Sequence, residues 1–388
     1  MNTDRARLAQ RCTSLFTSLL AAATLLGLAG CHGEQPTAWS TSLLARTDKI
    51  FDVDHVTGDT FVAVGYNGRI LRSEDAGETW ADVDSGTGWT LNHVDFAGQH
   101  GWAVGHGGAV IHSRDGGQTW VGQQADTEKT LMAVSFVDEN HGWACGDEST
   151  WMWTNNGGET WNVERMDVSQ EGLSEFSSLA VPDIIYYAVQ FLDHNNGWMV
   201  GEYGNIRYTT DGGKTWGAQH GSLLDGLASR GGARDVMTMA AFFNVHFTDP
   251  NNGLLVGGGG AIATTNDGGQ HWTWVAREGD NTWTEGNTFD VPALHMYAVG
   301  SPGGNSGRLV AVGMNALTME TSDGGKNWEP VDTPGGIYTW INGIAFGENG
   351  KGVLVGGKGT IMTTADGGKS WTLVQQDVTD AEQQADAH

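Results

Sequence analysis

Short apolar segments that end in glycine recur along the chain. In Gly101–Gly105, Gly142–Gly146 and Gly253–Gly257, three consecutive apolar residues separate two glycines. A run of this length between turn-forming residues is typical of a β-strand that is buried on both faces. A second strand, such as Asn92–Phe96 or Phe243–Phe247, precedes each run. The seven apolar segments are 62–65, 101–105, 142–146, 197–201, 253–257, 310–313 and 352–356.

A polar octet follows each apolar segment and ends in tryptophan. It has Ser or Thr first, Asp third, Gly fifth and Trp last, and Asn156 replaces the Asp in the third copy. An Asp or Asn side chain can bond backbone amides within a turn, Gly permits a positive φ, and the Trp can begin the next strand. Because the same acid recurs in every copy, we expect a structural role for it rather than a catalytic one. The octets end at Trp80, Trp120, Trp161, Trp216, Trp272, Trp328 and Trp371.

Each repeat therefore contains four predicted strands, and there are seven repeats. Four strands in 40–56 residues, repeated in this way, predict an all-β fold, a seven-bladed β-propeller of four-stranded blades with Asp-box turns. We expect the propeller to span residues 49–376, and residues 377–388 to form a flexible acidic tail. The composition agrees with this fold, because 59 Gly and 17 Trp suit many short strands and tight turns.

The N-terminal segment has the features of an export signal. Arg5, Arg7 and Arg11 precede an apolar run that ends in Leu28-Ala29-Gly30-Cys31, which resembles the lipobox of bacterial lipoproteins. We expect residues 1–30 to be a signal peptide, Cys31 to carry lipid, and residues 31–48 to be an anchor and N-terminal arm. An ordinary signal peptide or a membrane helix is the alternative. The resemblance implies a sorting rule in which Asp directly after the cysteine marks an inner-membrane lipoprotein. Here His32 follows the cysteine, so the outer membrane is favoured.

Charge and cysteine content narrow the function classes. The formal net charge is −26, and it becomes −28 if the first 30 residues, with three Arg and one Asp, are removed. So acidic a protein repels phosphate backbones, which argues against nucleic acid as a partner. Of the three cysteines, only Cys145 lies in the predicted propeller, so we expect a buried thiol and no disulfide within the chain. The sequence contains no zinc-type Cys/His motif and no phosphate-binding loop, so we predict no metal site and no cofactor.

Departures from the repeat mark the candidate binding face. The turns that follow the apolar segments, here called the variable turns, lie opposite the octets, and the extra length at 169–183, 221–238 and 279–291 falls on the same face. Solvated turn residues are the alternative interpretation of the variable turns. Acids and histidines at alternate positions of the first strands, such as Asp52, Asp54, His93 and Asp95, could face a central channel, but this spacing is weak evidence for a metal. The candidate binding residues are Tyr66, His106, Asp147, Glu148, Glu202 and Tyr203.

The combined repeat resembles the photosystem II stability and assembly factor family of cyanobacteria and chloroplasts. The resemblance covers nearly all of the chain after Cys31. It implies a non-enzymatic, exported and often lipidated propeller that helps insert a reaction-centre subunit, with an arginine-rich patch at the partner site. This chain departs from that pattern, since only ten Arg follow residue 30. Relatives in non-photosynthetic bacteria are often encoded beside export transporters of the resistance-nodulation-division type, so a membrane protein complex or a transporter subunit is the expected partner.

Enzymes and glycan-binding proteins that carry Asp-boxes form the rival class. Sialidases use an arginine triad with a Tyr nucleophile, and this chain has no Arg-Ile-Pro signature, since Arg69-Ile70-Leu71 only begins a repeated strand. Propeller glucanases need paired acids across a cleft that commonly lies between two propellers, and one propeller is encoded here. We therefore expect a scaffold without enzymatic activity, with a glycan-binding protein or a glycoside hydrolase of the sialidase-like type as the alternative.

Overall fold

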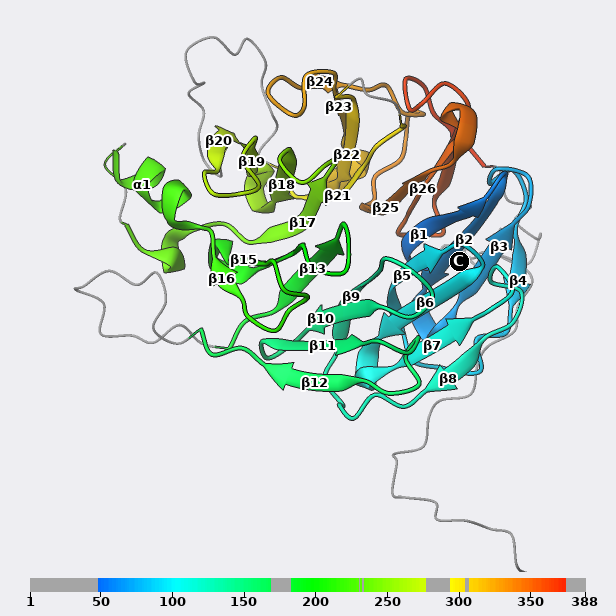
Figure 1. The fold of residues 1–388 in the computed structure, drawn as a ribbon. Helices are drawn as coiled ribbons and strands as arrows, with labels where there is room; N and C mark the ends of the chain where they lie inside the picture. Colours follow the sequence, from blue (N-terminus) through cyan, green and yellow to red (C-terminus); the bar gives the residue numbers. More distant parts are fainter. Residues whose placement is uncertain are drawn as a thin grey trace, which may run out of the picture. The chain divides into compact units, whose positions relative to one another are not determined.

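The computed structural model describes residues 48–168, 183–229, 231, 234–276, 294–303 and 307–374. Within these residues the chain forms seven four-stranded antiparallel sheets, each built from four consecutive strands (Figure 1). The innermost strands of neighbouring sheets contact one another in sequence order, and the first and last of them also meet, which closes a ring. The predicted seven-bladed β-propeller is therefore confirmed. The expected anchor, Cys31 and the acidic tail lie outside the described residues.

The strands have the following bounds, from the inner to the outer strand of each blade. The first four blades are β1 (Ile50–Thr57), β2 (Thr60–Gly65), β3 (Ile70–Ser73) and β4 (Ala81–Val83); β5 (Leu91–Ala97), β6 (His100–Gly105), β7 (Val110–Ser113) and β8 (Val121–Gln123); β9 (Leu131–Phe136), β10 (Gly142–Gly146), β11 (Thr150–Thr154) and β12 (Asn162–Arg165); and β13 (Tyr186–Phe191), β14 (Gly197–Gly201), β15 (Ile206–Thr209) and β16 (Gly217–Ala218). The last three are β17 (Phe242–Phe247), β18 (Gly253–Gly257), β19 (Ile262–Thr265) and β20 (Thr273–Ala276); β21 (Met296–Gly300), β22 (Leu309–Gly313), β23 (Thr318–Thr321) and β24 (Glu329–Pro330); and β25 (Ile341–Phe346), β26 (Gly352–Gly356), β27 (Ile361–Thr364) and β28 (Thr372–Leu373).

Glycines stand at the ends of the second strands because neighbouring atoms fill the space that a Cβ atom would take. In β10 every residue is buried. A Cβ on Gly142 would lie 2.3 Å from the ring of Phe136, and a Cβ on Gly146 would lie 2.0 Å from the carbonyl oxygen of Thr130. Both distances are too short for any side chain. The recurring glycines of the sequence therefore allow the inner strand to pack directly against the second strand.

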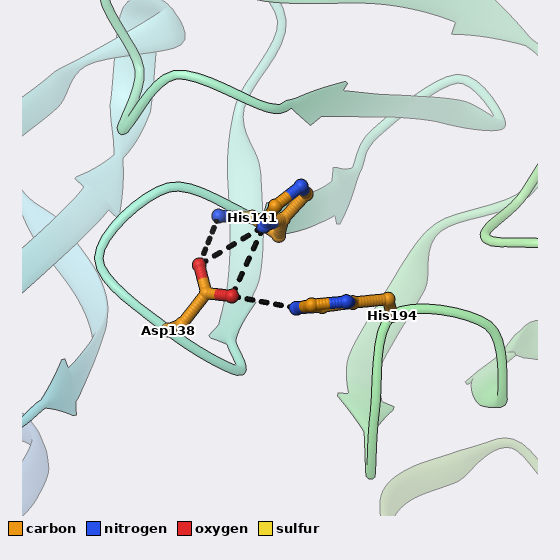
Figure 2. Close-up of side chains that lie close together, drawn as sticks. All are labelled: Asp138, His141 and His194. Atoms are coloured by element: carbon orange, nitrogen blue, oxygen red, sulfur yellow. Dashed lines mark hydrogen bonds and ion pairs between the residues drawn. The ribbon is translucent and has the colours of Figure 1, made fainter.

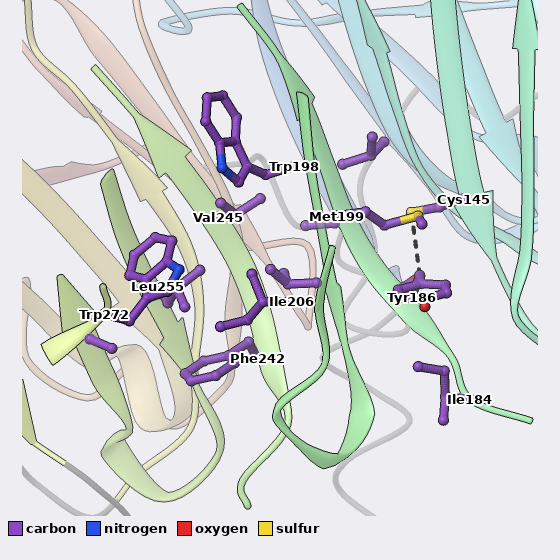
Figure 3. Close-up of a cluster of buried hydrophobic side chains, with 14 of the residues drawn as sticks. Cys145, Ile184, Tyr186, Trp198, Met199, Ile206, Phe242, Val245, Leu255 and Trp272 are labelled. Atoms are coloured by element: carbon purple, nitrogen blue, oxygen red, sulfur yellow. Dashed lines mark hydrogen bonds between the residues drawn. The ribbon is translucent and has the colours of Figure 1, made fainter. Parts of the chain in front are cut away.

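Aromatic stacking joins blades two to five. Trp102, Trp143 and Trp198 each stack on a phenylalanine of the following blade, with ring centroids 3.5–3.6 Å apart. Each indole N–H also donates to a carbonyl oxygen in the octet turn of that blade. Large aromatic rings bury much apolar area, so these contacts stabilise blade-to-blade packing. Figure 3 shows Trp198 in this apolar layer, with Trp272, Val245 and Met199.

The octet turns have the predicted structural role. In the first copy, the hydroxyl of Ser73 donates to the carboxylate of Asp75 (2.8 Å), and it accepts the backbone N–H of Gly77 (2.8 Å). The same carboxylate accepts the backbone N–H and the hydroxyl of Thr79. The bond from the first hydroxyl to the third residue recurs in the other six copies, with Asn156 as acceptor in the third. The acids are thus occupied within their own turns.

One α-helix interrupts the all-β pattern in the described residues. Helix α1 (Gly221–Ser229) lies in the insertion after the fourth blade and contacts β20 of the fifth. Leu223 and Leu224 are buried, and the backbone oxygen of Leu223 accepts the indole N–H of Trp274 at 3.1 Å. The apolar residues of this insertion therefore cover the edge of a neighbouring blade. No helix in the described part of the chain combines the length and the apolar character needed to cross a bilayer.

Candidate interaction face

The variable turns form one face of the ring. In all seven, the first residue donates its backbone N–H to the carbonyl oxygen of the residue just before the inner strand, at 2.9–3.1 Å. This shared bond places every variable turn beside the start of an inner strand. The octet turns lie at the opposite edge, because the third strand separates the two kinds of turn. The six candidate binding residues occupy the variable turns of the first four blades.

Bulky residues occupy a strained position in three variable turns. The second residue of every variable turn has a positive φ, which Asn or Gly adopts in the first, second, fifth and sixth blades. Glu148, Tyr203 and Lys358 occupy this position in the third, fourth and seventh blades, with φ of 51°, 53° and 57°. The left-handed conformation costs an L-residue other than Asn or Gly about 1–2 kcal/mol. Two of these three residues are candidate binding residues.

Three candidate residues gather around a tyrosine that the sequence analysis did not select. Tyr187 lies on β13, half-buried. Burial, with smaller contributions from the neighbouring Glu202, Asp147 and Tyr203, raises the pKa of its hydroxyl to about 12. The carboxylate of Glu202 also accepts the backbone N–H of Ile185 at 2.9 Å, which fixes its position. Acidic and aromatic groups from the third and fourth blades are thus brought together.

Of the other three candidate residues, Glu148 and Tyr66 each lie beside a lysine. Glu148 pairs with Lys129 at 2.6 Å, and this hydrogen bond lowers the pKa of its carboxyl. Tyr66 is half-exposed, with the ammonium of Lys49 5.3 Å from its ring centroid. His106 is exposed. Among the described residues, no hydrogen bond, ion pair or ring contact joins Tyr66 or His106 to the Tyr187 group.

Further aromatic rings extend the Tyr187 group across the next two blades. Tyr187 meets Phe243 of β17 edge to face at 5.1 Å, and Phe243 lies 5.5 Å from Tyr297 of β21. All three occupy the second position of an inner strand. The first position is apolar and buried in every blade, whereas the second varies between aromatic rings, Asn and Met. This variation within the repeat is the signal that could have identified these residues.

The acids of the first two inner strands hold neighbouring blades together. Asp52 and Asp54 accept the backbone N–H groups of Val94 and Phe96 at 3.0 and 2.8 Å, and Asp95 accepts that of Phe136 at 2.5 Å. Burial raises the pKa of all three carboxyls, that of Asp95 to about 6. For Asp54, the charge of Asp95 adds to the effect of burial. These bonds use the three carboxylates to join one inner strand to the next.

Cys145 and the arginines are not available on this face. The thiol of Cys145 is fully buried and donates to the backbone oxygen of Tyr186 at 3.6 Å (Figure 3), and burial raises its pKa. Arg207 is buried and donates to the hydroxyl of Tyr186. The other six described arginines each pair with an Asp or Glu. The part of the chain described here therefore contains no patch of unpaired arginines.

The family comparison agrees with this architecture. The model of the family described as "Photosynthesis system II assembly factor YCF48" matches residues 32–122, 119–184 and 229–332, which is more than half of the chain. The chain belongs to this family. The photosystem II assembly lipoprotein Ycf48 of Synechococcus sp. (strain CC9902) is 32% identical over 96 residues. That match spans 25% of this chain and only 25% of the relative.

Solved structures show the same fold. YCF48 bound to D1 peptide has a TM-score of 0.59 at 17% identity, covering 85% of this chain and 97% of that one. YCF48 from Cyanidioschyzon merolae has a TM-score of 0.53 at 21% identity, covering 73% and 84%. The GH74 xyloglucanase from Xanthomonas campestris reaches 0.62 at 12% identity and covers 88% of this chain, but this chain spans only 56% of the enzyme. At such low identities the likeness concerns the fold alone.

Proposed function

We propose that this YCF48-family chain is a non-enzymatic, lipid-anchored scaffold that binds a membrane protein complex and helps to assemble or operate it. Family membership supports an assembly role, and the YCF48 structure with a D1 peptide gives a precedent for a partner from a membrane complex. The observation that carries the proposal is the acidic and aromatic group around Tyr187. It combines apolar contact area with two carboxylates.

The charge of this face defines the chemistry of the partner. Asp147 and Glu202 lie beside Tyr187, and the described arginines are paired or buried. A partner segment with basic and aromatic or aliphatic side chains would complement such a surface. This differs from the arginine-rich patch that the family resemblance implies. A transporter subunit in a non-photosynthetic cell therefore fits the proposal as well as a photosynthetic client.

Affinity purification from detergent-solubilised membranes tests the proposal. We expect the wild-type chain to recover a membrane protein complex, and the double variant Asp147→Asn and Glu202→Gln to recover at least about tenfold less, as expected for loss of charge pairs in an interface. The exposed Glu78 lies in an octet turn, and Glu78→Gln is the matched control on the opposite face. Recovery of no complex, together with release of sugar from glycans, would overturn the scaffold and support the hydrolase alternative.

Anchoring is tested separately at the N-terminus. We propose that Cys31 holds the chain on the periplasmic side of a membrane, with the outer membrane preferred because His32 follows the cysteine. In Cys31→Ala the protein should move from the membrane fraction to the soluble periplasmic fraction, whereas Cys12→Ala, within the expected signal peptide, should leave fractionation unchanged. If Cys31→Ala stayed in the membrane fraction, the lipid anchor would be refuted. The proposed binding face does not depend on this result.

A further inference from the structure

Three consecutive blades share one polar turn between their inner and second strands. In the third blade, Oδ1 of Asp138 accepts the backbone N–H groups of the residues two and three positions later, at 2.7 and 2.8 Å. Asp193 and Asp249 make the same pair of bonds in the fourth and fifth blades. In these two blades, the amide of Asn196 or Asn252 also donates to Oδ2 of the Asp, at 2.8 Å.

Two histidines replace this arrangement at the boundary of the third and fourth blades. His141 stands where the next two blades have Asn, and its Nδ1 lies 3.0 Å from Asp138 Oδ2. His194, from the turn of the fourth blade, reaches across the boundary and places Nε2 2.6 Å from the same oxygen. The two imidazole centroids are 4.2 Å apart. Figure 2 shows both rings beside one carboxylate.

These three side chains have the donor set and spacing of a transition-metal site. Asp138 Oδ2, His141 Nδ1 and His194 Nε2 belong to a group whose ligand atoms all lie within 4.8 Å of one another. Zinc bonds of about 2.0–2.2 Å in tetrahedral geometry place ligand atoms about 3.4 Å apart. The present separations of 2.6 and 3.0 Å from Oδ2 need only a small expansion. Two imidazoles with one carboxylate favour zinc over magnesium or calcium.

We propose that Asp138, His141 and His194 bind a divalent transition metal of the zinc class across the boundary of the third and fourth blades. On metal binding, the nitrogen of each imidazole that faces Asp138 gives up its proton and offers its lone pair, and the other nitrogen carries the proton of the neutral ring. Oδ1 of Asp138 stays fixed by the turn amides, which orients Oδ2. All three side chains are partly exposed, so solvent reaches the site and water can fill the remaining coordination position.

The proposal explains why sequence spacing did not reveal the site. Asp138 and His141 lie three residues apart, but His194 is 53 residues further along the chain and is brought in by the blade repeat. The metal would pin one blade to the next on the face of the octet turns, away from Tyr187. This inference is independent of the proposed scaffold function.

Zinc titration of the purified full chain tests the inference, with zinc alone as the probe in a metal-buffered solution. We expect one tight site in the wild type. His141→Asn restores the residue found in the next two blades, so the turn should fold. Because even outer-shell partners contribute about 10–100-fold to metal affinity, loss of this ligand should weaken zinc binding at least about tenfold. His194→Gln should have the same effect.

The matched control is His271→Asn. Nδ1 of His271 lies 2.7 Å from an octet carboxylate, so this variant also removes an exposed His–Asp pair, but one without a second imidazole. It should bind zinc as the wild type does. Cobalt should give the visible absorption bands of nitrogen and oxygen coordination in the wild type and lose them in His141→Asn. Absence of a stoichiometric site in the wild type, or equal zinc affinity in His141→Asn, would overturn the proposal.

Discussion

The strained variable turn of the seventh blade gives a quantitative test of how the repeat is built. Lys358 has φ of 57°, is exposed, and places its ammonium 3.4 Å from the backbone oxygen of Tyr338. Asn315 occupies the same position in the sixth blade with φ of 58°. We therefore expect Lys358→Asn to stabilise the fold, because Asn adopts this conformation at a lower energetic cost than Lys.

The magnitude follows from two opposing contributions. Relief of the left-handed strain gains about 1–2 kcal/mol. Loss of an exposed, long contact to a carbonyl oxygen removes less than about 0.5 kcal/mol. The net gain in unfolding free energy is about 0.5–2 kcal/mol. In a protein of this size that corresponds to a rise in Tm of about 1–3 °C.

The reciprocal variant supplies the control. Asn315→Lys places a bulky residue in an equally exposed turn and should lower the unfolding free energy by about 1 kcal/mol. Urea unfolding followed by tryptophan fluorescence and calorimetric Tm measure both variants. A lower midpoint for Lys358→Asn, or no loss in Asn315→Lys, would refute the strain argument. Confirmation would imply that Glu148 and Tyr203 are retained on the candidate face at a similar cost in stability.

Four further predictions concern a core tryptophan, two titrating acids and a buried thiol. Trp198→Ala should lower the unfolding free energy by about 3–5 kcal/mol in urea titration because it empties a stacked site, whereas the exposed Val121→Ala should change it by less than about 0.5 kcal/mol. Since the folded pKa of Asp95 is raised to about 6, this group should make the fold more stable as pH falls from about 6 toward 4, and Asp95→Asn should remove that increment from the pH profile of Tm. Asp366, with a pKa lowered to about 2, contributes stability above pH 4 that is lost as pH falls toward 2, so Asp366→Asn should lower Tm above pH 4 and reduce the fall of Tm between pH 4 and pH 2. Cys145 should react with a maleimide only after unfolding, as read by peptide mapping, and rapid labelling of the native chain would contradict its burial.

The repeat made the architecture predictable. Two local signals define the four strands of each blade: the glycines that bound the apolar runs and the octet that ends in tryptophan. They recur because every blade makes the same close contacts. The six candidate residues of the variable turns were likewise placed on one face. Their value for binding stays a prediction.

The remaining features depend on contacts between blades. Tyr187 was missed because its partners, Asp147 and Glu202, come from two blades. The role of Asp95 was ambiguous, since an acid on an inner strand can face water or accept an amide from the next strand. The pairing of Asp138 with His194 needs the two turns to meet in space. Periodicity predicts each blade well, but it does not say which side chains cross a blade boundary.

Site-specific photo-crosslinking in intact membranes tests the central claim most directly. A photoreactive residue is placed at Glu148 in a variable turn and, in a separate chain, at Glu159 in an octet turn, both of which are solvent-accessible. We predict crosslinks to a subunit of a membrane protein complex from position 148 and none to that subunit from position 159. Crosslinks to the subunit from position 159 alone, or none from position 148, would contradict the assignment of the variable turns as the partner-binding face.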